Sequence, residues 1–377
     1  MRCLGVWLAL VLLLALGAAR AEDCDVPTDL HDGWTVSAPA AQGLDPALVC
    51  AIGPRFDAWT EANLHGVVVA RHGALVYEHY LTGEDEQWDR PLGRVAYDAG
   101  KLHDLRSITK SVTSLVVGIA LDRGWIKDVD APVFSFFPEY DDRRTPEKDH
   151  VTLRHLLTMS AGFAWTDPSM SYGRSADTES LMIGAPDPYR YLLELPLATP
   201  PGQIYQYNSG DTSLLAAVLH KVSGKGFDEL VQEVLFNPLG ISDVEWMRYA
   251  IGDPIAGWGL RMRPRDVAKI GQLVLDHGRW HGKQIVPEAW IGQSTAPQFN
   301  GEGLFFYGYQ WWLGRSLIER REIDWIAAVG LGGQRLFIVP DCDLVVAVTA
   351  GLYNSPLQGQ VGLTVLNSYV LPAATGH

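Results

Sequence analysis

Runs of apolar and β-branched residues of strand length lie near both ends of the chain, at residues 65–71, 74–80, 324–329, 335–339 and 344–349. The first two runs are joined by His72-Gly73, a dipeptide that suits the positive φ angles of a tight hairpin turn. Four residues, Pro-Asp-Cys-Asp, separate the last two runs. We therefore expect antiparallel hairpins at both ends of the chain, and we expect them to form one sheet together.

Between these runs, apolar residues recur every three or four positions, which is the spacing of amphipathic helices. Helices are expected at residues 46–61, 104–122, 152–162, 212–222, 227–236 and 264–278. Asp104 and Thr152 are candidate N-caps, and Gly124 and Gly224 stand where two of the helices stop.

The order of these elements predicts an α+β fold with one antiparallel sheet, built from residues 30–100 and 250–377 and flanked by helices of the chain ends. A mostly helical subdomain, residues 101–249, is inserted between the two halves of the sheet. With 47% hydrophobic and 20% charged residues, the chain of 377 residues has a globular composition. Its net charge of −14, without a cluster of basic residues, argues against a nucleic-acid partner.

The N-terminus has the composition of a signal peptide, which we expect to comprise residues 1–21. Arg2 provides a positive start, residues 4–16 are apolar, and Ala19-Arg20-Ala21 forms a small-x-small cleavage site. An apolar stretch of about 14 residues is short for a membrane-spanning helix. We expect an exported protein, periplasmic or secreted, in which residues 22–377 form a single catalytic unit without stable membrane insertion.

Cysteine and histidine spacing bears on disulfides and metals. Cys24, Cys50 and Cys342 remain after signal cleavage, and a Cys24–Cys50 disulfide would fasten the N-terminal arm. His277 and His281 are four residues apart, but the glycine after each makes the stretch a turn rather than a ligating helix. We expect no metal site there and no cofactor.

One serine motif stands out, because the sequence has no Gly-x-Ser-x-Gly elbow, no His-Glu-x-x-His and no phosphate-binding loop. Ser107 and Lys110 are three residues apart in a predicted helix, so the hydroxyl and the amine can meet on one face. The apolar residues 112–121 favour a neutral amine that helps to deprotonate Ser107, and the helix N-terminus suits an oxyanion. The alternative is a chance pairing of the two residues.

The surroundings of this motif carry a resemblance. Residues 103–115 (His-Asp-Leu-Arg-Ser-Ile-Thr-Lys-Ser-Val-Thr-Ser-Leu) resemble the nucleophile segment of the serine β-lactamase/penicillin-binding-protein superfamily. The nearest branch is the class C β-lactamase-related one, which includes 6-aminohexanoate-dimer hydrolases, D-alanyl-D-alanine carboxypeptidases and family VIII esterases. The resemblance continues in order through residues 129–132, 136–140, 151–162, 201–215 and 330–334. It covers about residues 30–370 and implies a β-lactamase/transpeptidase-like fold with the site between sheet and helical subdomain.

The resemblance implies roles for residues of two motifs. Ser107 is the nucleophile, and Lys110 handles its proton. The family's Tyr-x-Asn motif matches Tyr207-Asn208-Ser209, in which Tyr207 would shuttle the proton to the leaving group. Ser209 replaces the family's asparagine, as in members similar to 6-aminohexanoate-dimer hydrolases, and would lie at the substrate. Tyr205 is a rival for Tyr207 at two residues' distance, although it is better described as a core aromatic residue.

The third motif of the family departs further from its pattern. Where a Lys-Thr-Gly or His-x-Gly strand is usual, this chain has Ala328-Val329-Gly330, so the basic residue is absent. A cation at this position binds the carboxylate of β-lactams and peptidyl-D-alanine, and its loss argues against both substrates. Arg335 is an alternative source of positive charge. Gly330 lets a substrate approach the strand, and the Leu331 N–H would be the second oxyanion donor beside the Ser107 N–H.

Three other residues take lesser roles. Trp258 lies in a glycine-rich segment that borders the pocket in the family, and its bulk would narrow the pocket. Tyr172 belongs to the polar stretch 166–180, which is either a lid over the site or a surface loop. His155 is expected to pack in the helix that follows Thr152, near the chemistry but outside it.

We interpret the chain as an exported serine hydrolase that cleaves a small-molecule substrate, a linear amide or an ester, through a Ser107 acyl-enzyme. One alternative is a peptidase similar to D-alanyl-D-alanine carboxypeptidases or β-lactamases that acts on cell-wall fragments. A second alternative is a catalytically inert exported binding or scaffold protein that keeps this fold.

Overall fold

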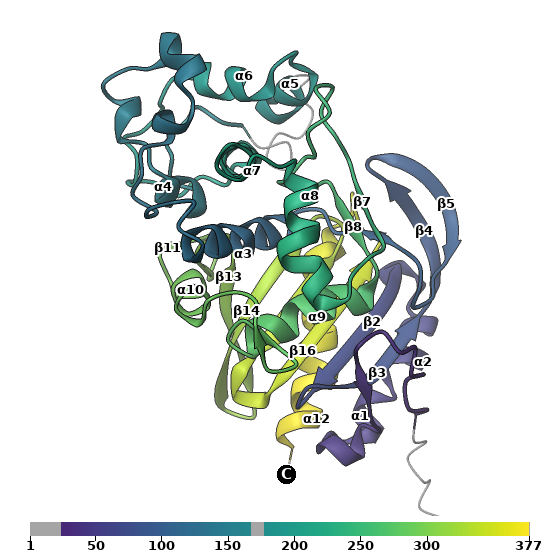
Figure 1. The fold of residues 1–377 in the computed structure, drawn as a ribbon. Coiled ribbons are helices and arrows are strands. Elements are labelled where there is room, and N and C mark those ends of the chain that lie inside the picture. The colour runs from purple at the N-terminus through teal and green to yellow at the C-terminus, as the bar shows by residue number, and fades with distance from the viewer. Residues whose placement is uncertain (1–23, 167–176, 377) are drawn as a thin grey trace, which may run out of the picture.

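A large mixed sheet forms the centre of the protein (Figure 1). The computed structural model describes residues 24–166 and 177–376, and within them this sheet has nine strands in the order β1-β3-β2-β16-β15-β14-β13-β12-β11. The strands are β1 (Thr35–Val36), β2 (Leu64–Arg71), β3 (Ala74–Tyr80), β11 (Phe299–Asn300), β12 (Phe306–Tyr307), β13 (Trp312–Ile318), β14 (Arg321–Gly330), β15 (Gln334–Val339) and β16 (Leu344–Ala350).

Both predicted hairpins are present, and the sheet joins the two ends of the chain as expected. The β2–β3 turn uses His72 and Gly73, with φ angles of 50° and 73°. β2 and β16 pair antiparallel at the junction of the two halves, where Val67 lies opposite Val348. Only β1 pairs in parallel, with β3, among the described strands of this sheet. The predicted fold class is confirmed.

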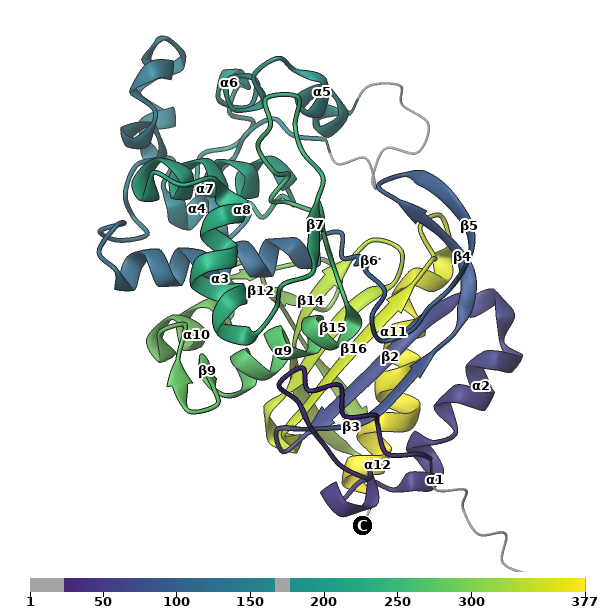
Figure 2. The same cartoon turned by 45° about the vertical axis from the view of Figure 1, so that its right-hand side comes forward.

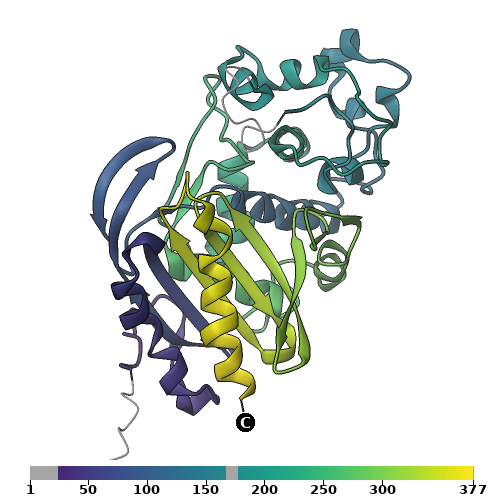
Figure 3. The ribbon, with the colours of Figure 1, turned by 180° about the vertical axis from the view of Figure 1, so that it is seen from behind.

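Helices cover both faces of the sheet, which is why its central strands are apolar on both sides. On one face lie α1 (Pro46–Val49), α2 (Ile52–Ala58), α11 (Val361–Val365), a π-helical turn and α12 (Leu371–Thr375), as Figure 3 shows. On the other face lie α3 (Ile108–Asp122) and α9 (Pro264–Leu275) (Figure 1). The terminal helices therefore flank the sheet on the side away from α3.

The inserted residues form a helical layer on the far side of α3 (Figure 1). Its helices include α4 (Leu153–Leu157), α5 (Thr178–Gly184), α6 (Pro188–Glu194), α7 (Ser209–Ser223) and α8 (Phe227–Val231), the last continued by a π-helical turn. α3 lies between this layer and the sheet, and every residue from Ile108 to Ala120 is buried.

Smaller strands and a helix complete the edges of the protein. β4 (Thr82–Gln87) and β5 (Arg90–Ala96) form a curved hairpin that rises from the β2 side of the sheet (Figure 2). β6 (His103–Asp104) pairs with β8 (Leu260–Met262), which also pairs with β7 (Val244–Trp246). β9 (Arg279–Trp280) and β10 (Lys283–Gln284) form a two-stranded sheet, and Trp280 packs on Trp34 just before β1. α10 (Glu288–Ser294) packs on α3, where the Trp290 indole N–H donates to the Ser114 carbonyl at 3.0 Å.

The prediction that Asp104 caps the first long helix is wrong. Asp104 lies in β6, and the helix begins three residues later than expected, with Ser107 at the N-cap. The buried Asp104 carboxylate instead accepts the Trp88 N–H at 2.7 Å and pairs with Arg261 at 2.7 Å. These partners hold Asp104 in an extended strand, so the chain enters the helix through a turn at Arg106.

Other boundaries differ because of local backbone constraints. The single helix expected at residues 46–61 is divided into α1 and α2, since Pro54 has no N–H for a bond to the preceding turn. The helix after Thr152 ends at Leu157, and Met159 follows with a φ of 55°. α7 begins earlier than expected, because Asn208 caps it by accepting the Gly210 N–H at 2.8 Å.

The predicted Cys24–Cys50 disulfide is present, and Cys342 is a buried free thiol. His277 and His281 occupy turn positions with φ angles of 53° and 47°. Within residues 24–166 and 177–376, no helix has the length and apolar character to cross a bilayer. The predicted signal peptide at residues 1–21 lies outside the described residues.

Candidate functional site

Ser107 occupies the N-cap of α3 at the point where that helix leaves the short strand β6. The preceding residue, Arg106, has a φ of 50°, in the left-handed region that non-glycine residues seldom adopt. Ser107 is partly exposed while the residues that follow it on α3 are buried. The turn therefore presents one hydroxyl at the edge of an otherwise closed helix.

Lys110 lies beneath Ser107 and is 1% exposed. Its Nζ lies 3.0 Å from the Ser107 Oγ, 3.0 Å from the Ser209 Oγ and 2.8 Å from the Gly257 carbonyl oxygen. Two of these acceptors are hydroxyls and the third is a backbone carbonyl. A lysine amine within hydrogen-bonding reach of a serine hydroxyl is placed to take up the serine proton.

Tyr207, rather than its rival Tyr205, faces the lysine. The Lys110 Nζ lies 4.8 Å from the centre of the Tyr207 ring. Tyr207 also stacks on Trp312 with ring centres 5.9 Å apart. Tyr205 packs edge-on against Tyr307, 5.2 Å away, and against Trp312. The Tyr207 ring therefore lies beside Lys110, and the Tyr205 ring lies in the aromatic cluster next to it.

The end of β14 closes the other side of the site. A Cβ at Gly330 would come within 2.3 Å of the Leu105 carbonyl oxygen, so only glycine lets the strand lie against the chain leading to Ser107. Leu331 follows and is 38% exposed. Its carbonyl accepts the Gln334 amide at 3.2 Å, which fastens the turn after the strand. The two predicted oxyanion donors thus belong to chain segments that meet at Gly330.

Comparison with known proteins places this arrangement in a family. The family described as beta-lactamase matches residues 56–360, which is most of the chain. The chain belongs to the beta-lactamase family. Among curated relatives, it is 27% identical to the 6-aminohexanoate-dimer hydrolase of Paenarthrobacter ureafaciens over 67% of each chain.

A second curated relative is the lovastatin esterase of Penicillium rubens, 27% identical over 65% of this chain and 62% of the esterase. Among solved structures, a protein of Bacillus anthracis assigned to the 6-aminohexanoate-dimer hydrolases shares the fold with a TM-score of 0.67. That pair is 21% identical and covers 83% of this chain and 79% of the other. These relatives support the branch that the motifs indicated.

This member of the beta-lactamase family has no basic side chain at position 328. Ala328 on β14 is 1% exposed and pairs with Leu336. Arg335, the alternative cation, donates to the carbonyl oxygens of Gly330 at 3.0 Å, Gln334 at 2.8 Å and Gln358 at 2.9 Å. Burial lowers the pKa of Arg335 to about 10. Its hydrogen bonds hold the backbone after β14 instead of facing a substrate carboxylate.

The lesser predicted residues have distinct positions in this beta-lactamase fold. Trp258 follows Gly257, whose carbonyl accepts from Lys110, and the Arg106 guanidinium lies 5.9 Å from its ring. His155 completes a capping box with Thr152 at the start of α4, and burial lowers the pKa of its imidazole. Tyr172 lies outside the described residues.

Sequence reasoning missed the network that holds Arg106. Its guanidinium pairs with Glu86 at 2.7 Å, Asp89 at 2.9 Å and Asp104 at 3.5 Å, and lies 4.8 Å from the Tyr353 ring. The nearby carboxylates raise the pKa of Arg106 against the opposing effect of burial. An arginine directly before the candidate nucleophile was the signal available in the sequence, but Glu86 and Asp89 lie on a hairpin too polar to be recognised as strands.

Proposed function

We propose that this protein is a serine hydrolase that cleaves a linear amide or ester through an acyl-enzyme on Ser107. The observation that carries the proposal is the 3.0 Å contact between the buried Lys110 Nζ and the Ser107 Oγ. A nucleophile and its base within hydrogen-bonding reach, the base itself oriented by Ser209 and Gly257, is the arrangement that covalent catalysis requires.

In the proposed acylation, neutral Lys110 accepts the Ser107 proton while Oγ bonds to the carbonyl carbon of the substrate. The backbone N–H groups of Ser107 and Leu331 stabilise the oxyanion that forms. As the bond to the leaving group breaks, Tyr207 delivers a proton to the departing nitrogen or oxygen. Water then attacks the acyl-enzyme, and the same groups return the proton to Ser107.

Two features support a linear, largely apolar substrate. An aromatic cluster lies beside Lys110, formed by Tyr205, Tyr207, Tyr307 and Trp312. The position that binds a carboxylate in the resembled family holds the buried Ala328. The names of the relatives, a dimer hydrolase of 6-aminohexanoate and an esterase, support amide and ester bonds as the bonds cleaved.

Export belongs to the same proposal. The composition of residues 1–21 supports a signal peptide. The Cys24–Cys50 disulfide is of a kind that forms and persists in oxidising compartments. Fractionation of expressing cells should recover the protein without residues 1–21 outside the cytoplasm, and a full-length cytoplasmic protein would contradict export.

A fluorophosphonate probe tests the nucleophile. The purified wild-type protein should be labelled at one site, and Ser107→Ala should lose the label while Ser135→Ala, an exposed control, keeps it. Absence of labelling in the folded wild type would favour the inert binding or scaffold protein. A panel of p-nitrophenyl esters, linear ω-amino amides and D-amino-acid amides then separates the proposed activity from the peptidase alternative, which requires preference for the last class.

A further inference from the structure

A second cluster of chemically active side chains lies beside the site, where three strands meet. His65 on β2, Asp85 on β4 and His103 on β6 are buried, and one ligand atom of each lies within 4.8 Å of the others. The His65 Nδ1 is 2.8 Å from the His103 Nε2. The Asp85 carboxylate oxygens lie 3.9 Å from the His65 Nδ1 and 3.8 Å from the His103 Nε2.

Proton placement on the two imidazoles leaves this cluster incomplete. The His103 Nδ1 lies 3.0 Å from the Asp104 carbonyl, which only accepts, so Nδ1 carries the proton and Nε2 of the neutral ring carries a lone pair. If the His65 Nδ1 donates to that lone pair, the His65 Nε2 has no proton to donate to the backbone carbonyl of Glu84, its hydrogen-bond partner. With the His65 proton on Nε2, two lone pairs face each other at 2.8 Å.

The charge of the Asp85 carboxylate also leaves this cluster incomplete. The Asp85 carboxylate accepts hydrogen bonds from the hydroxyls of Tyr97 and Tyr353, but among the described residues its only ion-pair partners are the two imidazoles. The tyrosine hydroxyls carry no charge, and no lysine or arginine of the described residues forms an ion pair with Asp85. A buried carboxylate without such a partner is costly, and a bound cation would neutralise it.

We propose that His65, Asp85 and His103 bind one divalent transition-metal ion of the zinc type. Two imidazole nitrogens and one carboxylate are ligands that such ions prefer, with bonds of about 2.0–2.2 Å. Two ligand atoms bound to the same ion can be at most about 4 Å apart. The Asp85 oxygens lie 3.9 Å and 3.8 Å from the imidazole nitrogens, so an ion fits between them. The Asp104 carbonyl on the His103 Nδ1, and the two tyrosine hydroxyls on Asp85, are outer-shell partners of the kind that orient metal ligands.

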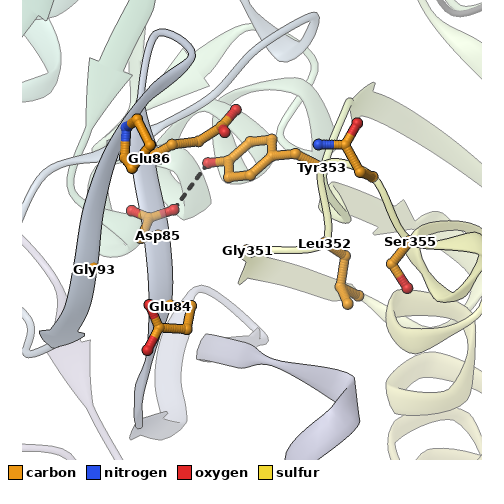
Figure 4. A pocket seen from close by; sticks show the side chains of 10 residues that line it. Glu84, Asp85, Glu86, Gly93, Gly351, Leu352, Tyr353 and Ser355 are labelled. Atoms are coloured by element: carbon orange, nitrogen blue, oxygen red, sulfur yellow. Dashed lines mark hydrogen bonds between the residues drawn. The ribbon is translucent and has the colours of Figure 1, made fainter.

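A cavity of about 400 Å³ leads to this cluster (Figure 4). It is lined by Glu84, Asp85 and Glu86 of β4 and by residues 351–355, and the Tyr353 hydroxyl points at Asp85 across it. Carboxylates along the cavity concentrate cations from solvent. The ion would join β2, β4 and β6, and β6 continues directly into Arg106 and Ser107. The ion would stabilise the strands that hold Ser107 in place, and it would take no part in the reaction.

Metal binding by the purified chain of residues 22–377 tests the inference. After chelator treatment and dialysis, Zn²⁺ should bind at one ion per chain by elemental analysis, with a micromolar or tighter dissociation constant, and should raise the unfolding temperature. Co²⁺ should give the visible absorption of a nitrogen- and oxygen-ligated ion. His103→Gln and Asp85→Asn should weaken Zn²⁺ binding by about 100-fold or more, while His277→Gln, an exposed control, should not.

Ser107→Ala should bind the ion as the wild type does, so the result is independent of the proposed hydrolase activity. Circular dichroism shows whether His103→Gln is folded, and Asp85→Asn tests the site independently if His103→Gln is not. Wild-type protein that binds no stoichiometric Zn²⁺ or Co²⁺ below about 100 μM would overturn the proposal, and so would equal binding by folded wild type, His103→Gln and Asp85→Asn.

Discussion

Arg106 and Glu86 form a 2.7 Å ion pair that joins the residue before the candidate nucleophile to the β4–β5 hairpin. Because Arg106 has a φ of 50°, the turn that aims Ser107 depends on contacts made elsewhere to keep its shape. The guanidinium supplies these contacts through two further carboxylates, Asp89 and Asp104, and the Tyr353 ring. We therefore expect Arg106 to act as a positioning residue for the serine.

Replacement of Arg106 should reduce turnover more than substrate binding. Arg106→Ala should lower kcat by about 10²-fold with a small change in KM, since misplacement of a nucleophile by about 1 Å has costs of that order. Arg106→Lys keeps the charge without the planar fork and should recover only part of the loss. Arg90→Ala, an exposed arginine of the same hairpin, is the control in p-nitrophenyl ester kinetics. Full kcat in Arg106→Ala would contradict this role.

Ser107, Lys110 and Tyr207 should behave as one proton-handling unit. Ser107→Ala should abolish acylation, and Tyr207→Phe should lower kcat by about 10²–10⁴, the usual contribution of general acid–base catalysis. Lys110→Ala should cost at least as much, and the double variant should be scarcely worse than the poorer single one. Burst kinetics with a chromogenic ester would measure this.

Tyr205→Phe is the matched control for the tyrosine, since it keeps the ring that packs on Tyr307 and loses only the hydroxyl. Its activity should stay near that of the wild type. If Tyr205→Phe lost acylation and Tyr207→Phe kept it, the assigned register would be wrong by two residues.

Stability should fall as pH rises because of Asp211. This carboxyl lies in the first turn of α7, accepts the Asn208 amide at 3.0 Å, and is fully buried, so desolvation raises its pKa well above the usual 3.8. The folded state then holds a proton that the unfolded state releases above about pH 4. The free energy of unfolding should therefore drop by up to about 1.4 kcal/mol per pH unit from about pH 4 up to the raised pKa.

Asp211→Asn removes the ionisable group but keeps the shape and an acceptor for Asn208. Urea unfolding at pH 5 and pH 8 should show a shallower loss of stability in this variant than in the wild type. Equal pH dependence of the two proteins would mean that Asp211 ionises in the folded state at no cost.

Turnover of β-lactams should be poor. Ala328 is buried where a basic residue would bind the β-lactam carboxylate, and Arg335 is engaged by three backbone carbonyls. Nitrocefin hydrolysis should lie far below the kcat/KM of about 10⁶ M⁻¹s⁻¹ of an efficient dedicated enzyme. A value near that figure would show that another cation reaches the site.

The parts of the fold predicted correctly are those whose residues carry their own signal. β2 and β16 are apolar on both faces, and the turn at His72-Gly73 is local, so periodicity and turn chemistry sufficed. The Ser107–Lys110 contact was predictable for the same reason, because a separation of three positions along one helix fixes the distance between the two side chains.

Contacts between polar residues that are far apart in the sequence could not be predicted from these local patterns. The sequence Thr-Gly-Glu-Asp-Glu-Gln of β4 has no apolar alternation, although its Asp85 is buried against residues from β2 and β6. Asp104 was misread as a cap because its real partner, Arg261, is distant in sequence. Ligand spacing likewise gave no sign of the His65–Asp85–His103 cluster, whose members come from three separate strands.

The pairing of β2 with β16 also governs the order in which the chain can fold. Val67 meets Val348 only after almost the whole polypeptide has been made, so the main sheet stays in two unjoined parts while the helical insertion, whose contacts are more local, is already complete. Until then, β2 exposes an unpaired apolar edge, the kind of surface on which chains aggregate. Nascent or truncated chains ending before Leu344 are accordingly the species that most need protection by chaperones.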